Sequence, residues 1–212
     1  MQGSLRFLFI GDSITDAGRA DDQEGIGFGY VRNIRNHLIL TYPEANIEVV
    51  NKGVSGNKIT ELEERWKEDV LAYKPDYLSI SIGVNDVWRQ LDSPHKEQVT
   101  PERFRSIYMD LLQQVQSETG AKILLMEPTI LQEDTQSEGN QKLKDYVKIV
   151  QELSAQYDAI LVPTHEAFMK FLSVNKRIAL TTDGVHMNSV GDMLMAHTWV
   201  QAFLTREGWQ HV

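Results

Sequence analysis

Short apolar runs alternate with longer stretches of helical periodicity along the chain. Five runs rich in β-branched or aromatic residues predict buried strands, at residues 7–10, 47–50, 76–82, 122–126 and 159–162. Between these runs, apolar side chains recur every three or four positions, which predicts helices over residues 30–42, 59–70, 100–119, 140–157 and 166–172. A last helix is predicted to begin near residue 188 or 189.

Strands that alternate with helices in this way predict a parallel sheet with helices on both faces. Because crossovers between parallel strands are right-handed, few strand orders remain, and a flavodoxin-like order is the expected one. We therefore expect an α/β fold, a three-layer αβα sandwich around a central parallel five-stranded sheet. No linker or repeat divides the sequence, so residues 1–212 are expected to form a single domain. The polar stretches 16–29 and 87–100 are predicted to be loops.

Glycine and short polar residues follow the first three predicted strands. The first strand stops at Gly11, and Asp12 and Ser13 come next; Gly53 and Asn85 follow the second and third strands. In open α/β sheets, ligands bind at the carboxyl ends of the strands. Ser13 is therefore a candidate nucleophile. The alternative is that Asp12 or Ser13 only caps the segment that follows.

A fourth polar group, Asp-Gly-Val-His at 183–186, precedes the last predicted helix. Acyl transfer requires a nucleophile, a general base, a group that orients the base, and donors for the oxyanion. His186 is the candidate base for Ser13, and Asp183 is close enough in sequence to orient the imidazole. The backbone N–H groups of Ser13 and Gly53 and the side-chain amide of Asn85 are the candidate oxyanion donors.

Other roles are open for some of these residues. His165 follows the fifth predicted strand and is a rival base, and a metal site or a helix cap is the alternative for Asp183 and His186. One histidine with carboxylates is a poor zinc pattern, and no calcium loop is present. Trp88 and Arg89 are candidate sugar contacts, with packing inside their loop as the alternative.

Charge and composition exclude several classes of function. The sequence has 21 Lys and Arg against 30 Asp and Glu, a net charge of −9, and an acidic chain without a basic patch is not expected to bind nucleic acid or an anionic membrane. No apolar stretch approaches the roughly 20 residues that span a bilayer, and few residues precede the first strand, so a cytoplasmic protein is expected. The absence of cysteine excludes disulfides and cysteine nucleophiles.

Four blocks, in order, resemble the SGNH (GDSL-like) hydrolases: Gly-Asp-Ser-Ile at 11–14, Asn-Lys-Gly-Val-Ser-Gly at 51–56, Gly-Val-Asn-Asp at 83–86 and Asp-Gly-Val-His at 183–186. The departure from the family pattern is an isoleucine after Gly-Asp-Ser, where the family name has leucine. The resemblance implies the SGNH fold, with Ser13 as nucleophile and Asp183 and His186 as the rest of a triad. It also implies oxyanion donors at Gly53 and Asn85, and neither a metal nor an organic cofactor.

The segments 51–57, 65–66 and 83–90 are further similar to intracellular acetylxylan esterases of this superfamily. That similarity implies a serine esterase that removes acetyl groups from a small acylated carbohydrate, an acetyl-xylo-oligosaccharide, with Asp12, Trp88 and Arg89 as candidate substrate contacts. Asp12 and Asp86 are also expected to organise the strand-end loops. Alternatives are a short-chain thioesterase or lysophospholipase-type acylhydrolase and a non-catalytic carbohydrate-binding protein. Assembly into a homo-oligomer is open.

Overall fold

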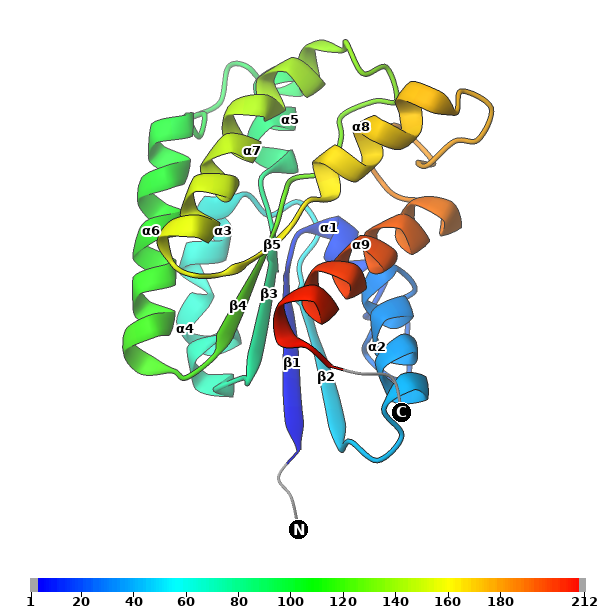
Figure 1. Ribbon diagram of the computed structural model, residues 1–212. Coiled ribbons are helices and arrows are strands. Elements are labelled where there is room, and N and C mark those ends of the chain that lie inside the picture. Colours follow the sequence, from blue (N-terminus) through cyan, green and yellow to red (C-terminus); the bar gives the residue numbers. More distant parts are fainter. Residues whose placement is uncertain (1–3, 210–212) are drawn as a thin grey trace.

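A computed structural model of the protein describes residues 4–209 and has three layers, with a sheet between two layers of helices (Figure 1). All strand pairs in this sheet are parallel, and the strand order is β2-β1-β3-β4-β5. The five strands are β1 (Leu5–Gly11), β2 (Ile47–Gly53), β3 (Tyr77–Ser81), β4 (Lys122–Met126) and β5 (Ile160–Val162). This is the flavodoxin-like order, so the predicted fold class is confirmed.

Helices cover both faces of the sheet. On one face α2 (Tyr30–Thr41) packs against α9 (Ser189–Glu207), and on the other α6 (Pro101–Glu118) packs against α7 (Glu138–Gln156) (Figure 1). The shorter elements are α1 (Ser13–Asp16), α3 (Ile59–Glu64), α4 (Trp66–Asp69), the 3-10 turn η1 (Leu71–Tyr73), α5 (Val84–Asp92) and α8 (Thr164–Val174). Within residues 4–209, no helix has both the length and the apolarity that a membrane crossing requires.

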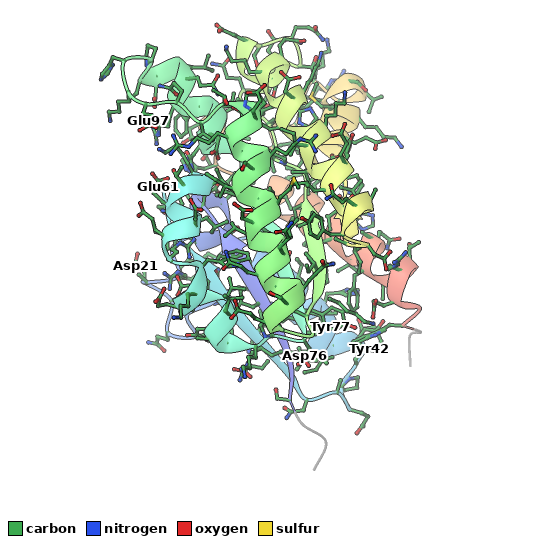
Figure 2. All side chains as sticks on the ribbon, turned by 90° about the vertical axis from the view of Figure 1, so that its left-hand side faces the viewer. Asp21, Tyr42, Glu61, Asp76, Tyr77 and Glu97 are labelled. Atoms are coloured by element: carbon green, nitrogen blue, oxygen red, sulfur yellow. The ribbon has the colours of Figure 1, made fainter. Side chains whose placement is uncertain are left out.

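Figure 2 looks directly onto the α6 face and separates the two ends of the sheet. Asp76 and Tyr77, at the amino end of β3, lie at one end of the molecule, and Glu97, in the loop before α6, lies at the other. The strands run the same way, so their carboxyl ends all face the Glu97 end. The segments that follow the strands are therefore collected at one edge.

The apolar run of β1 forms the centre of the core. Phe7, Leu8, Phe9 and Ile10 are at most 1% exposed, because β1 has a strand on each side and a helix layer above and below. Trp199 of α9 is fully buried against this strand, and its indole N–H donates to Ser79 Oγ in β3 at 3.0 Å. This bond satisfies a polar group that would otherwise be costly to bury.

The continuous helix predicted over residues 59–70 is wrong. The chain leaves helical geometry at Arg65 (φ −107°, ψ 5°), which separates α3 from α4. The Arg65 guanidinium donates to the carbonyl of Gly11 at 2.9 Å and to that of Lys52 at 2.7 Å, so it joins the ends of β1 and β2. The apolar spacing that predicted one helix is nevertheless kept, since Ile59 and Trp66 remain buried.

The loop predicted over residues 87–100 is half wrong, because α5 occupies Val84–Asp92. Val84 and Val87 are buried, and with Trp88 and Leu91 they have helical spacing. This helix begins without an intervening loop after the turn at Gly83, whose φ of +124° favours glycine. As a result, Asn85 lies in the first turn of a helix and Trp88 lies one turn further on.

Asp86 joins two of the strand-end segments. Its side chain is fully buried, and its two oxygens lie 3.1 and 3.3 Å from the backbone nitrogen of Ile59 at the start of α3. Burial raises the pKa of Asp86 to about 7, the Ile59 N–H opposes that rise, and the nearby Asp12 carboxyl adds to it. The predicted role of Asp86 as an organiser of these loops agrees with this position.

The buried Asp86 carboxyl predicts a pH-dependent stability. Its ordinary pKa is 3.8, so between about pH 4 and 7 the folded protein binds more protons than the unfolded chain, and stability falls as the pH rises. Asp86→Asn keeps an acceptor for Ile59 but cannot ionise. We expect urea unfolding at pH 8 to show a gain over the wild type of up to about 4 kcal/mol, and little gain at pH 4.

The exposed Asp110 of α6 offers a matched control, because Asp110→Asn removes the same charge from the surface. That variant should follow the wild-type dependence of stability on pH. An Asp86→Asn protein with the wild-type dependence would contradict the buried-charge explanation.

Candidate active site

Ser13 is the first residue of α1, and only Asp12 separates it from the carboxyl end of β1 at Gly11. Asp12 is the N-cap of this helix, and its carboxylate accepts a hydrogen bond from the Ile14 N–H at 3.0 Å. Capping is therefore done by Asp12, while Ser13 lines a cavity of about 400 Å³ together with His186. Of the two candidate caps in the Gly-Asp-Ser motif, Asp12 is therefore the one that caps the helix.

His186 lies against Ser13 although 173 positions separate them in the sequence. The distance from Ser13 Oγ to His186 Nε2 is 2.9 Å, and that from His186 Nδ1 to Asp183 Oδ2 is 2.6 Å. Burial works to raise the pKa of Asp183, but hydrogen bonds from the His186 side chain and from the backbone outweigh it and lower this pKa to about 2. An ionised Asp183 accepts a hydrogen bond from the Nδ1–H group, which leaves the unprotonated Nε2 to accept a hydrogen bond from the Ser13 hydroxyl.

The segment that carries Asp183 and His186 is closed on itself. The Thr182 N–H donates to the His186 carbonyl at 2.8 Å, and a single antiparallel bridge pairs Thr181 with Met187. The Asp183 Oδ1 atom also accepts the backbone N–H of His186 at 2.8 Å. These bonds hold the imidazole and its carboxylate in one geometry.

The loop that follows β4 also binds the segment that carries Asp183 and His186. The Glu133 carboxylate, which follows β4, accepts the backbone N–H groups of Leu180 at 2.7 Å and Thr181 at 2.8 Å. The Gln132 N–H donates to the Gly184 carbonyl at 2.7 Å. Nothing in the sequence indicates this support, because a single glutamate in a polar loop carries no signal of its partner.

The backbone N–H of Gly53 already has a partner inside the protein. It donates to the Asn51 side-chain oxygen at 2.8 Å, and a Cβ at Gly53 would come within 2.1 Å of the Asp16 nitrogen. Gly53 is thus a close-packing position between β2 and α1. The expectation that its N–H faces the substrate disagrees with this arrangement.

The next glycine, Gly56, occupies the turn between Ser55 and Asn57. Ser55 lines the cavity that contains Ser13, and the Asn57 carbonyl accepts one N–H of the Asn85 side-chain amide at 3.1 Å. Gly56 has φ +84°, and a Cβ there would meet no atom within 4 Å. Its backbone therefore lies between the cavity and Asn85. The sequence shows this glycine as the last residue of the second block, but it does not reveal the turn that separates it from the strand.

The expected substrate contacts divide into a buried group and an accessible group. Asp12 is only 2% exposed; burial raises its pKa to about 6, and the Ile14 N–H and the nearby His186 side chain oppose that rise. A side chain so enclosed organises the loop, as the sequence analysis also expected, and does not reach a substrate. Trp88 is half-buried, and its ring centroid lies 6.1 Å from that of His186.

Arg89 is engaged within its own helix. Its guanidinium lies over the Trp88 ring, 4.9 Å from the centroid, and pairs with Asp92. Trp88, Asp92 and Asp183 line a second cavity of about 370 Å³. Trp88 therefore borders this second cavity, whose lining residues include neither Arg89 nor Ser13.

The rival base does not approach Ser13. His165 is 8% exposed, and its Nδ1 lies 2.5 Å from the Thr129 carbonyl oxygen. Its ring is thus bound to the loop after β4. In the part of the chain that the structure describes, no group of three or more His, Cys, Asp or Glu side chains could hold a metal ion.

Comparisons with known proteins agree with this geometry. The family described as the GDSL-like Lipase/Acylhydrolase family matches residues 9–194. An acetylxylan esterase from Geobacillus stearothermophilus is 38% identical over 219 residues, which cover 98% of this chain and 95% of that protein. A second relative, an acetylxylan esterase from Xylanibacter ruminicola, is 27% identical, and the alignment covers 92% of this chain but 42% of that protein.

Solved structures give the same result. The crystal structure of Axe2, the acetylxylan esterase from Geobacillus stearothermophilus, superposes with a TM-score of 0.87 at 36% identity over 98% of this chain and 96% of that one. LAE5, an alpha/beta hydrolase from the metagenome of Lake Arreo, has a TM-score of 0.87 at 30% identity over 95% and 96% of the two chains. The chain therefore belongs to the GDSL-like lipase/acylhydrolase family, and it is a carboxylic ester hydrolase.

Proposed function

We propose that the protein is a serine esterase that removes acetyl groups from carbohydrates, with acetylated xylo-oligosaccharides as the substrate class. The observation that carries this proposal is the hydrogen-bonded chain from Ser13 through His186 to Asp183, in a protein 38% identical to an acetylxylan esterase. Catalytic mutants of that esterase replace a serine, an aspartate and a histidine. The aspartate and the histidine lie three positions apart there, as Asp183 and His186 do here.

In the first half of the reaction, Ser13 Oγ attacks the acetyl carbonyl carbon while His186 Nε2 takes the hydroxyl proton. Collapse of the tetrahedral intermediate breaks the bond to the sugar oxygen, and His186 returns the proton to that oxygen. In the second half, His186 activates water, which releases acetate and restores Ser13. Asp183 remains ionised throughout, keeps the imidazole in the required tautomer and stabilises its charged form.

The oxyanion is bound by three N–H donors in this proposal. They are the backbone N–H of Ser13, the backbone N–H of Gly56 in place of Gly53, and the side-chain amide of Asn85. The Asn85 amide has two N–H bonds, and the one that donates to the Asn57 carbonyl fixes the direction of the other. Donors that are held in place before the reaction stabilise the charge that develops in the transition state.

The cellular location and the oligomeric state of the protein remain predictions. A cytoplasmic esterase would act on short acetylated oligosaccharides that have already entered the cell, which suits cavities of about 400 Å³ better than a polymer surface. Homo-oligomer formation is open to size measurement in solution.

Removal of the proposed nucleophile gives the first functional prediction. Ser13→Ala should lower the rate of aryl acetate hydrolysis by several orders of magnitude while leaving the fold intact, because Ser13 is half-buried at the cavity and its side chain bonds to His186. Ser173→Ala changes an exposed serine of α8 and serves as the control. A pure Ser13→Ala sample with wild-type activity would eliminate this serine as the nucleophile.

Asn85 gives a graded test of the oxyanion site. Asn85→Ala removes one of the three proposed donors and should lower kcat about 10²–10³-fold, with a smaller change in KM. Circular dichroism and thermal unfolding check the fold, since Asn85 also bonds to Asn57. If a folded Asn85→Ala enzyme keeps the wild-type kcat, Asn85 does not stabilise the transition state.

The length of the acyl chain separates the proposed activity from a thioesterase or lysophospholipase. We expect kcat/KM for aryl esters to be highest with acetate and to fall as the chain lengthens, because a half-buried carboxyl, Asp192, forms part of the cavity wall next to Ser13. A maximum at long chains would contradict the acetylesterase proposal and favour the lysophospholipase-type alternative.

A further inference from the structure

Asp192 is a carboxyl group beside Ser13 that the reaction above does not use. It lies in the first turn of α9, six positions after His186, and lines the cavity that contains Ser13 and His186. Among the described residues that line this cavity, Asp192 is the sole carboxylate. Its side chain is half-buried, so one part of it reaches the cavity while the rest packs inside.

One contact of Asp192 is structural. The backbone N–H of Tyr30, the first residue of α2, donates to the Asp192 carboxyl, and Gly29, the N-cap of α2, has no side chain to offer this N–H. A Cβ at Gly29 would lie 3.0 Å from Asp192 Oδ1. Burial raises the pKa of Asp192 to about 6, and the Tyr30 N–H opposes that rise. The Tyr30 N–H needs only one acceptor. A carboxylate has two oxygens with several lone pairs, so Asp192 can accept further hydrogen bonds.

Phe28 forms another part of the same cavity wall. Its side chain is 61% exposed, which is unusual for a large aromatic residue and places a wide apolar face in the cavity mouth. The ring lies above Gly18, where a Cβ would come 3.4 Å from Phe28 Cδ2. Phe28 therefore packs on backbone at Gly18, and the Arg32 guanidinium lies over its ring, 5.6 Å from the centroid.

A carboxylate and an aromatic face together fit a sugar better than an acyl chain. The apolar C–H face of a pyranose can pack on an aromatic ring while its hydroxyl groups donate to a carboxylate, and such charge-assisted hydrogen bonds are the strong ones. An alkyl chain in the same place would displace the water that solvates Asp192 and would offer no hydrogen-bond donor in return. This unpaired desolvation of the carboxylate would weaken binding of the chain. The cavity also touches His186, which returns the proton to the departing sugar oxygen.

We propose that the cavity of about 400 Å³ beside Ser13 binds the sugar that leaves in the reaction, and that Asp192 determines specificity by accepting a hydrogen bond from a hydroxyl of this pentose while Phe28 packs on its ring. This inference rests on the proposed function and extends it to the substrate side of the site. The competing location is the second cavity, of about 370 Å³, whose wall contains Trp88 and Glu138 but not Ser13.

The experiment compares two substrates in each variant: an aryl acetate, which has no sugar, and an acetylated xylo-oligosaccharide. The quantity measured is the ratio of kcat/KM for the oligosaccharide to kcat/KM for the aryl acetate. Asp192→Asn keeps an acceptor for the Tyr30 N–H but removes the charge, and should lower this ratio roughly ten- to hundredfold, mainly through KM. Phe28→Ala should lower it in the same direction.

Glu138→Gln is the matched control, because it neutralises a carboxylate in the wall of the second cavity. It should keep the wild-type ratio. If Asp192→Asn does not fold, Phe28→Ala decides, since an exposed side chain can be removed without loss of the core.

Four outcomes would overturn the inference. An Asp192→Asn enzyme with the wild-type ratio, or one that loses both activities equally, would show a structural role alone. A ratio that falls in Glu138→Gln and not in Asp192→Asn would move the sugar to the second cavity. A wild-type enzyme that hydrolyses the aryl acetate but not the oligosaccharide would instead overturn the proposed substrate class itself, together with this inference.

Discussion

The parallel register of β1 with its two neighbours is the constraint on which the site depends. Gly11 pairs with Gly53 of β2 on one side and with Ser81 of β3 on the other, so these three neighbouring strands end at one level. A Cβ at Gly11 would come within 2.2 Å of the Ser81 carbonyl oxygen, which shows how closely the chain passes here. Arg65 fixes the same level by binding the carbonyls at the ends of β1 and β2. Ser13, Gly56 and Asn85 come shortly after the ends of these strands in the sequence, so the shared level brings all three to one edge of the sheet.

The edge of the sheet also contains charge that packing alone would not favour. Asp12 and Asp86 are buried behind Ser13, and burial raises the pKa of both carboxyls. Each of them accepts a backbone N–H at the beginning of a helix, α1 or α3. The loops around Ser13 are thus held by polar groups that cost stability at neutral pH. Such a cost is common where loops must keep one conformation for function.

The sequence predicted the fold class and the polar groups at the strand ends, because strand period, glycine turns and helix caps are local signals. It failed where a side chain acts across the fold. Arg65 breaks the predicted helix by binding carbonyls at the ends of two strands, β1 and β2. The bond from the Gly53 N–H to the Asn51 side chain is local, an Asx turn over two residues, and was overlooked in the sequence. Helix α5 was not predicted, because it begins shortly after the end of β3 with no loop to mark its start. Its apolar residues do have helical spacing. Asp192 carries no motif, and its place beside Ser13 appears only when α9 packs on α2.

We expect Ser13, activated by His186, to be the residue that forms the acyl-enzyme. Labelling with a serine-directed phosphonate, followed by peptide mass spectrometry, tests this claim most directly, because the adduct is stable and reports the nucleophilic atom itself. The account predicts one adduct per chain, on the peptide that contains Ser13, and much slower labelling in His186→Ala, where no base lies 2.9 Å from the hydroxyl. An adduct on a different serine, or no adduct on the folded wild-type protein, would contradict it.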